Sequence, residues 1–431
     1  MKERTVVLLV AAVQFVNILD FMMVMPLGPD FADALGMSTS HIGYLGAAYT
    51  FSAAAAGIAG AGFLDRFDRR SALAVAMLGL VIGTAAGGFA TGFYSLIAAR
   101  LLAGAFGGPA TSISLAIIAD VVPPERRGKA VGTVMTAFSL ASILGVPAGL
   151  GLAEWAGWRA PFFGVAALGL LLTGAAVSLM PKLRGHLEAV NAAPVTAGAR
   201  NLPFDSLTKA TLLNTALVMV GVFAVVPNIS TFLQKNVGYP RGGLDTLYLV
   251  GGTASFLANR GVGALVDRFG ATRPVLGGTL VFGIALYFGF LDPVSVDHVI
   301  WVFPLLMLSA TLRGVPLNTL ASRVPAPSQR ARFMSAQNAV QHIASAVGAL
   351  GASALLTADA TGRLYGMERV TLLAIGISLF VPPLASFIER GVREKERQRS
   401  AGAAAPEARS PSAEKSMTGG SASGAPREQD V

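Results

Sequence analysis

Long apolar segments recur along almost the whole chain, and each is long enough to cross a lipid bilayer as a helix. A spanning helix needs about 20 apolar residues. Inside a bilayer only helices and closed barrels satisfy every backbone hydrogen-bonding group. The sequence predicts twelve such helices, at residues 5–27, 41–63, 72–90, 94–120, 130–153, 160–180, 208–230, 244–266, 274–291, 298–322, 333–356 and 366–389. We therefore expect an all-α integral membrane protein.

The composition agrees with this fold class and excludes several others. Only 13% of the 431 residues are charged, against about 25% in soluble domains. The net charge of +9 comes from basic residues scattered through short loops, without the basic stripe of a nucleic-acid-binding surface. There is no cysteine, no metal-ligand spacing among the four histidines and no G-x-x-x-x-G-K-[ST] loop. We expect that the protein binds no nucleic acid, no metal and no cofactor, and that it does not use ATP as its energy source.

The distribution of basic residues predicts the orientation. Most of the 33 Lys and Arg residues fall in the N-terminal tail, in alternate loops on the same side and in the C-terminal tail. Basic loops stay in the cytoplasm, so both termini are predicted to be cytoplasmic in a multi-pass protein of the inner membrane. The basic start followed by an apolar run resembles a signal peptide, but the run is longer than a signal and lacks a small-residue cleavage site.

The chain also repeats itself at a nearly constant offset. Asp267 follows Asp65 by 202 residues within similar loop sequences, and Pro227 follows Pro26 by 201 residues. This predicts a duplicated six-helix unit with a solute site between the halves. We expect an N-terminal bundle at residues 1–181, a cytoplasmic linker at 182–207, a C-terminal bundle at 208–390 and a disordered tail at 391–431.

One carboxylate, Asp20, interrupts the first apolar segment. A charge at mid-helix depth costs about 2.5–3.5 kcal/mol on insertion scales and usually has a function. Asp20 lies seven residues from Leu27, where the first helix ends, and Arg100 lies seven residues from Phe93, near the start of the fourth, so both are about 10 Å below the outer surface. Asn17 shares the helix face of Asp20, and Gly104 leaves room beside Arg100. Asp20 and Arg100 are either a proton-coupling pair or an inert ion pair that holds two helices together.

Several motifs resemble the major facilitator superfamily, in particular its twelve-helix drug/proton antiporter group, over residues 5–390. The loop motif G-x-x-x-D-R-x-G-R-R corresponds to "AGFLDRFDRR" from Ala61 to Arg70, and its second copy contains Gly263, Asp267, Arg268 and Gly270. Arg100 and Gly104 match the motif of the fourth helix, and "DVVPPERRGKAVG" matches the loop after it. The glycines and proline of the fifth helix resemble the antiporter signature, with each pair split by one residue.

The resemblance implies roles for these residues. The first helix acid and the fourth helix arginine would lie together beside the transport cavity. The loop charges would close a cytoplasmic gate against the helix near Phe333, although they could instead only anchor the loops at the membrane surface. This gate set comprises Asp65, Arg66, Arg69, Arg70, Arg126, Arg127, Asp267 and Arg268. Gly145, Pro147 and Gly149 would form a hinge in the fifth helix, or simply allow close packing.

Polar residues in the second half are further candidates for the cavity wall. These are Asn228, Arg313, Gln337 and Gln341, beside Asn17 and Gly104 in the first half. Arg313, like Arg260, could bind an anionic group on the transported molecule or extend its charge to the inner surface.

The sequence therefore predicts a transporter and not an enzyme. The expected function is proton-coupled export of a small organic solute or drug by a monomer in the bilayer, through alternating access. The alternatives are a proton symporter that imports a small, anionic solute and a non-transporting sensor on the same scaffold. A lipid-modifying enzyme would need acids, bases or metal ligands gathered at one interface, and the sequence has no such group.

Overall fold

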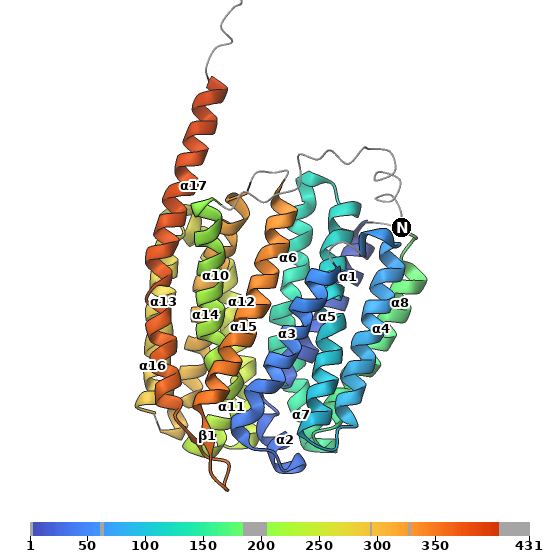
Figure 1. Ribbon diagram of the computed structural model, residues 1–431, viewed down its shortest axis with the longest axis vertical. Helices are drawn as coiled ribbons and strands as arrows, with labels where there is room; N and C mark the ends of the chain where they lie inside the picture. The colour runs from blue at the N-terminus through green and yellow to red at the C-terminus, as the bar shows by residue number, and fades with distance from the viewer. Residues whose placement is uncertain (1–2, 61–63, 184–204, 294, 326–328, 405–431) are drawn as a thin grey trace, which may run out of the picture.

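The computed structural model describes residues 3–60, 64–183, 205–293, 295–325 and 329–404, and long helices run side by side through them (Figure 1). Those of the first half are α1 (Glu3–Met23), α3 (Ile42–Gly60), α4 (Arg69–Gly88), α5 (Phe93–Val121), α6 (Pro124–Leu140) continuing into α7 (Val146–Ala156), and α8 (Ala160–Leu179). Those of the second half are α10 (Ser206–Val225) with α11 (Ile229–Thr231), α12 (Leu244–Phe269), α13 (Thr272–Leu286), α14 (Val299–Arg323), α15 (Arg330–Leu355), and α16 (Met367–Ser378) followed by α17 (Val381–Ala404).

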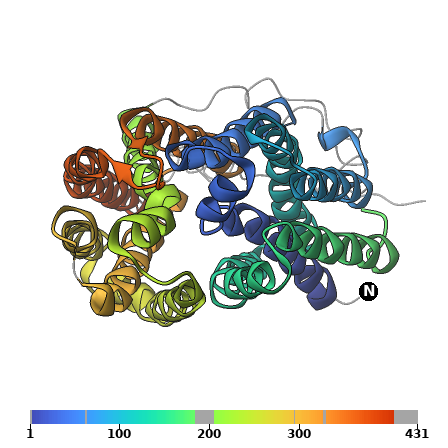
Figure 2. The same cartoon turned by 90° about the horizontal axis from the view of Figure 1, so that it is seen from below.

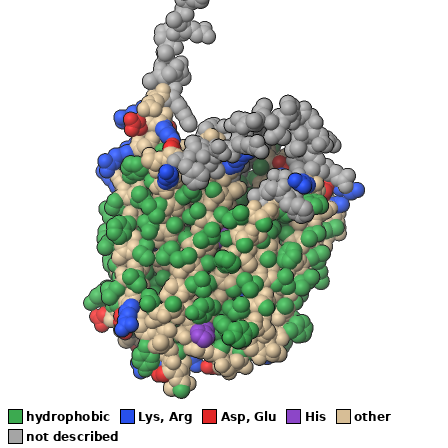
Figure 3. Space-filling view, viewed as in Figure 1, with side chains coloured by type: hydrophobic (Ala, Val, Ile, Leu, Met, Phe, Trp, Pro, Cys, Tyr) green, Lys and Arg blue, Asp and Glu red, His purple; other side chains and the backbone are tan. Residues whose placement is uncertain are grey.

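These helices can form a membrane protein. In the described part of the chain, ten helical segments are long and apolar enough to span a bilayer. The more polar α12 and α15 lie among them and bring the number of long segments to the twelve that the sequence predicts. Hydrophobic side chains cover the visible flank, and charged side chains gather toward its two ends (Figure 3). The predicted all-α membrane fold is confirmed.

The helices form two groups that follow the order of the chain (Figure 2). The two groups meet where α3 packs against α15. They also meet where α12 packs against α7 and against Ala141–Gly145, the turn that precedes α7. Gly43 makes the first contact possible, because a Cβ atom at this position would lie 2.8 Å from the carbonyl oxygen of Ala349. A glycine is therefore required for the close approach of α3 and α15.

Repeat-equivalent residues touch each other across the two groups. The rings of Phe21 and Phe223 have centroids 5.9 Å apart, and Lys235 donates to Asp33 at 3.0 Å. Both pairs are separated by 202 residues, which is within one residue of the offset of 201 between Pro26 and Pro227 in this part of the repeat. Equivalent residues can meet only near the axis that relates the two copies, so this axis runs beside α1 and α10.

The two ends of the helices form two different faces. The N-terminal face contains the start of α1 and the far end of α17 (Figure 1). The opposite face, here called the hairpin face, contains the short helix α2 (Gly28–Leu35) and a two-stranded antiparallel hairpin, β1 (Thr357–Ala358) and β2 (Leu364–Tyr365). Asp359 in this hairpin accepts hydrogen bonds from Thr361 and the Arg363 N–H, which hold the pKa of its carboxyl group below the usual range.

The predicted hinge coincides with an irregularity in the fifth long segment. Ala141–Gly145 forms a π-helical turn between α6 and α7, in which the Val146 N–H donates to the Ala141 carbonyl. Pro147 lies at the start of α7 and has no N–H to continue the α-helical ladder. The π-helical turn and the missing donor of Pro147 are adjacent, and π-bulges often occur at functional sites.

The C-terminal part differs from the expected boundary. We expect disorder from residue 391, but α17 continues as a helix to Ala404. Its last turns are rich in alternating charges, such as "REKERQR", which stabilise an exposed helix. The remainder of the tail and most of the predicted linker lie outside the described residues.

Candidate functional site

Asp20 and Arg100 form a two-pronged ion pair inside the first bundle. The Arg100 Nη1 donates to Asp20 Oδ1 at 3.0 Å, and Nη2 donates to Oδ2 at 2.9 Å. Thr84 of α4 donates its hydroxyl to Oδ1 at 2.7 Å. Asp20 is 0% exposed and Arg100 is 1% exposed. The three helices α1, α4 and α5 therefore converge on one carboxylate that is removed from solvent.

A second set of polar contacts continues from this pair. Tyr49 of α3 lies beside the guanidinium, with its ring centroid 4.8 Å from Arg100 Cζ. Its hydroxyl donates to Asn17 Oδ1 at 2.6 Å, and Asn17 Nδ2 donates to Thr111 Oγ1 at 2.8 Å. Any movement of the Arg100 side chain would therefore disturb contacts among four helices.

The pairing of Asp20 with Arg100 and the nearby position of Asn17 follow from helix depth and periodicity in the sequence. Thr84 and Tyr49 were not predicted. A hydroxyl or a tyrosine in an apolar helix is common, and no spacing in this sequence marks these two.

Gly104 places Arg100 by allowing α5 to approach α3. A Cβ atom at Gly104 would collide with the Tyr49 carbonyl oxygen and the Ser52 hydroxyl. One of these atoms belongs to the backbone and cannot move aside without moving the helix. Gly104 therefore acts as a close-packing position one turn from Arg100.

The candidates in the second half do not join this network in the described part of the chain. Asn228 is buried, donates to the Ala224 carbonyl at 3.3 Å and leaves its Oδ1 without a partner there. Gln337 donates to Asn318 at 3.4 Å, and Gln341 is half-buried on the next turn of α15. Arg313 is fully buried in α14 and contacts the Phe282 ring of α13. The structure therefore separates these residues from Asp20 and Arg100.

The predicted gate residues lie at the N-terminal face. Arg69 pairs with Asp120 at 3.2 Å, Arg126 pairs with Glu3 at 2.8 Å, and Arg70 donates to carbonyl oxygens at the end of α8. Each of these contacts joins elements of the first half. Arg66, Asp267 and Arg268 are exposed, and the side chains of Asp65 and Arg127 lie outside the described residues.

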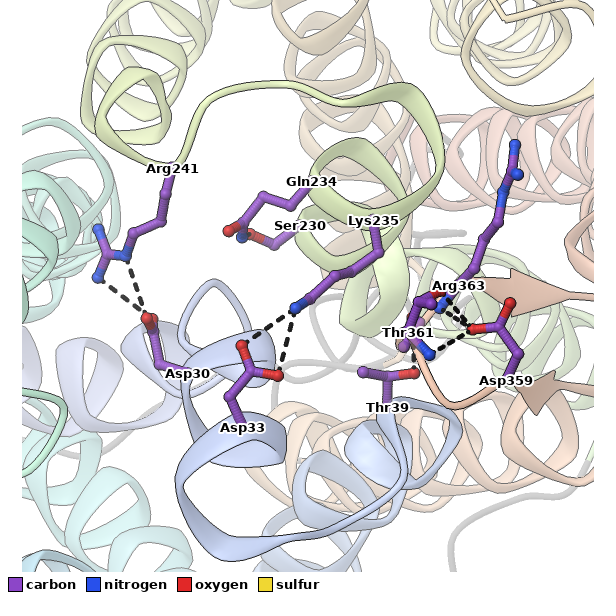
Figure 4. Close-up of polar contacts among 11 residues, drawn as sticks. Asp30, Asp33, Thr39, Ser230, Gln234, Lys235, Arg241, Asp359, Thr361 and Arg363 are labelled. Atoms are coloured by element: carbon purple, nitrogen blue, oxygen red, sulfur yellow. Dashed lines mark hydrogen bonds and ion pairs between the residues drawn. The ribbon is translucent and has the colours of Figure 1, made fainter.

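Polar contacts between the halves gather instead at the hairpin face (Figure 4). Arg241 binds the Asp30 carboxylate at 3.1 and 3.2 Å, and Lys235 binds Asp33 at 3.0 and 3.2 Å. Ser230 donates to the Pro26 carbonyl at 3.1 Å, and Thr39 donates to the Gly362 carbonyl at 3.0 Å. We call the two ion pairs, Asp30–Arg241 and Asp33–Lys235, the hairpin-face latch.

The hairpin-face latch was missed in the sequence analysis, although one signal for it was available. Asp33 and Lys235 have opposite charges and are separated by the repeat offset. Repeat-equivalent loops meet near the axis, so opposite charges at equivalent positions indicate a contact.

The buried pair generates a prediction about stability. Removing one partner of a buried ion pair costs about 3–5 kcal/mol, because the other charge stays buried without compensation. We expect Arg100→Gln to lower the thermal unfolding temperature of the purified protein more than the double variant Asp20→Asn/Arg100→Gln does. Purely additive losses in the two single variants and the double variant would show that the two groups are not coupled.

Comparisons with known proteins agree with this architecture. The family model described as Major Facilitator Superfamily matches residues 10–349. The chloramphenicol resistance protein of Streptomyces lividans is 28% identical over 283 residues, which cover 64% of this chain and 69% of that protein. The multidrug resistance protein MdtG of Salmonella arizonae is 26% identical over 380 residues, which cover 84% of this chain and 89% of that protein. Other curated relatives are matched over about half of their length.

The fold itself is also found in solved structures. A crystal structure of a D-xylose–proton symporter superposes with a TM-score of 0.69 at 16% identity, covering 87% of this chain and 96% of that one. Members of this family are transporters of small molecules through membranes and are not enzymes. The family model covers most of the chain, and the helices, repeats and loop motifs agree with it. This protein belongs to the major facilitator superfamily.

Proposed function

We propose that this protein is a proton-coupled exporter of a small organic solute or drug, which works as a single chain by alternating access in the cytoplasmic membrane. The observation that carries the proposal is the Asp20–Arg100 pair, a titratable group buried at membrane depth and bound to a fixed cation. The names of the relatives from Streptomyces lividans and Salmonella arizonae, both resistance proteins, support export rather than import.

The chemistry of the pair provides a means of coupling. Burial favours the neutral form of a carboxyl group, and a neighbouring guanidinium favours the charged form. A conformational change that separates Arg100 from Asp20 would therefore favour protonation, and re-formation of the pair would release the proton. A proton that enters through a potential of 100 mV supplies about 2.3 kcal/mol, more than a tenfold solute gradient requires.

We place the N-terminal face in the cytoplasm, because the basic loops, the start of α1 and the end of α17 are on this side. The hairpin face then lies outside, and the hairpin-face latch closes the protein toward the outside. Half-exposed ion pairs of this kind contribute only about 0–1 kcal/mol each. A closure built from such weak pairs can open during every transport cycle.

The role of Asp20 is tested by Asp20→Asn, which keeps the shape of the side chain and removes its titration. In an efflux-deficient host we expect the wild type to raise the tolerated concentration of chloramphenicol, or of another drug in a panel, and Asp20→Asn to return it to the vector level. In proteoliposomes, Asp20→Asn should lose drug transport driven by a proton gradient while keeping downhill exchange, because only the coupling step is removed.

A matched control is Asp297→Asn, the same chemical change at an exposed position, which should transport like the wild type. Proton-driven transport at the wild-type rate in Asp20→Asn would refute the coupling role. Drug uptake driven by an inward proton gradient in right-side-out vesicles would favour the symporter instead.

The hairpin-face latch is tested by cross-linking. The natural chain has no cysteine, so Asp33→Cys combined with Lys235→Cys introduces the only two thiols. A short bis-methanethiosulfonate reagent, which forms one disulfide with each thiol and releases sulfinate, should join the halves and stop transport, because the outer side must open in each cycle. A reductant that cleaves these disulfides should restore transport. The two single-cysteine variants are the controls. Undiminished transport by fully cross-linked protein would contradict a gating role for this contact.

A further inference from the structure

The second bundle contains a buried cation at the depth of the membrane centre. Arg313 lies 14 residues from the start of α14 and 10 residues from its end. At 1.5 Å per residue, these distances are about 21 Å and 15 Å. The side chain is 0% exposed. It therefore does not extend its charge to the inner surface, which was one of the two sequence interpretations.

The guanidinium is only partly satisfied by the protein. Its Nε donates to the Ser309 carbonyl at 3.4 Å, a long hydrogen bond. Its Nη1 and Nη2 atoms have no hydrogen-bond partner among the described residues. The Phe282 ring lies against the group, with 3.9 Å between Cζ and the ring centroid. An aromatic ring offsets part of the cost of burying a cation, but it accepts none of the free N–H groups.

Comparison with Arg100 shows that Arg313 lacks a carboxylate partner in the described part of the chain. Both Nη atoms of Arg100 bind one carboxylate. In the second half, from residue 205 to 390, seven acidic residues lie at a helix end or in a connection: Asp205, Asp245, Asp267, Asp292, Asp297, Asp359 and Glu368. The eighth, Glu389 of α17, binds Thr272 and Arg393. Asp20 is the one acid at comparable depth in the first half, and it already binds Arg100. The described residues therefore place no carboxylate against Arg313.

We propose that Arg313 is an anion-binding position for the transported molecule, and that the cargo contains a carboxylate or similar oxyanion. Two free Nη groups in a planar fork match the two oxygens of a carboxylate. The adjacent Phe282 ring suits an aromatic acid. Because a buried, unpaired cation is costly, its retention at this position is explained by a partner that arrives with the cargo. This proposal rests on the transport function proposed above.

The first test measures whether an anion reaches this side chain. Reconstituted protein is treated with phenylglyoxal, which modifies accessible guanidinium groups, and the adducts are mapped by mass spectrometry. Benzoate is the anionic probe and benzamide is its neutral match. We expect modification of Arg313, slowed severalfold by benzoate and unchanged by benzamide. Exposed Arg363 should react equally in all samples, and Arg100, held by Asp20, should resist.

Either of two results overturns the proposal. Arg313 could stay unmodified under conditions that modify Arg363, or its modification rate could be the same with benzoate as with benzamide. The assay needs no proton gradient. It therefore gives the same answer in Asp20→Asn, and failure of the coupling proposal is distinguishable from failure of this one.

The second test separates a binding role from a packing role. Arg313→Met keeps most of the side-chain volume and removes the charge. We expect its thermal unfolding temperature to be equal to or above that of the wild type, and benzoate, which should stabilise the wild type, to have no effect on it. Arg313→Lys should keep part of the benzoate effect. An Arg313→Met protein that is less stable than the wild type yet still stabilised by benzoate would assign Arg313 to packing.

Discussion

The lack of water in the bilayer core is the constraint on which this structure depends. A charge placed there needs a partner from the protein or from a ligand. The two bundles meet this requirement differently. The first bundle contains a complete pair, Asp20 with Arg100, supported by the Thr84 hydroxyl. The second contains Arg313, with two free Nη groups among the described residues. One half therefore contains a paired charge, and the other contains a buried cation with donor groups that no described residue accepts.

The backbone fold was predictable because the physical requirement is simple. A segment that spans a membrane must be apolar and helical along its whole length, and the sequence shows this directly. The Asp20–Arg100 contact was also predictable, because helix depth places the two charges at the same level and the family resemblance implies that their helices are neighbours. Depth does not give the rotation of a helix about its axis. For this reason Thr84 and Tyr49 were missed, and Arg313 could not be assigned to the surface or to the interior.

The predicted cytoplasmic gate shows a second limit of prediction from the sequence. The loop motif with Asp65 predicts an ion-pair latch at the N-terminal face, and a latch of this kind belongs to one conformation only. In this structure the ion pairs between the halves, among the described residues, lie at the hairpin face, and Arg69 pairs with Asp120 within its own bundle. One sequence encodes the contacts of all the conformations that the protein adopts. It does not tell which of these contacts occur together in one conformation.

The duplication of the six-helix unit explains where residues of the two halves contact each other. Phe21 with Phe223 and Asp33 with Lys235 are equivalent pairs that meet across the axis. Asp20 immediately precedes Phe21, so the proton-coupling candidate lies next to the point where the halves touch. A rocking motion of one bundle against the other would change the packing of Phe21, because its contact with Phe223 joins the two bundles. The carboxylate is therefore placed where a change in the relation of the bundles can alter its contact with Arg100.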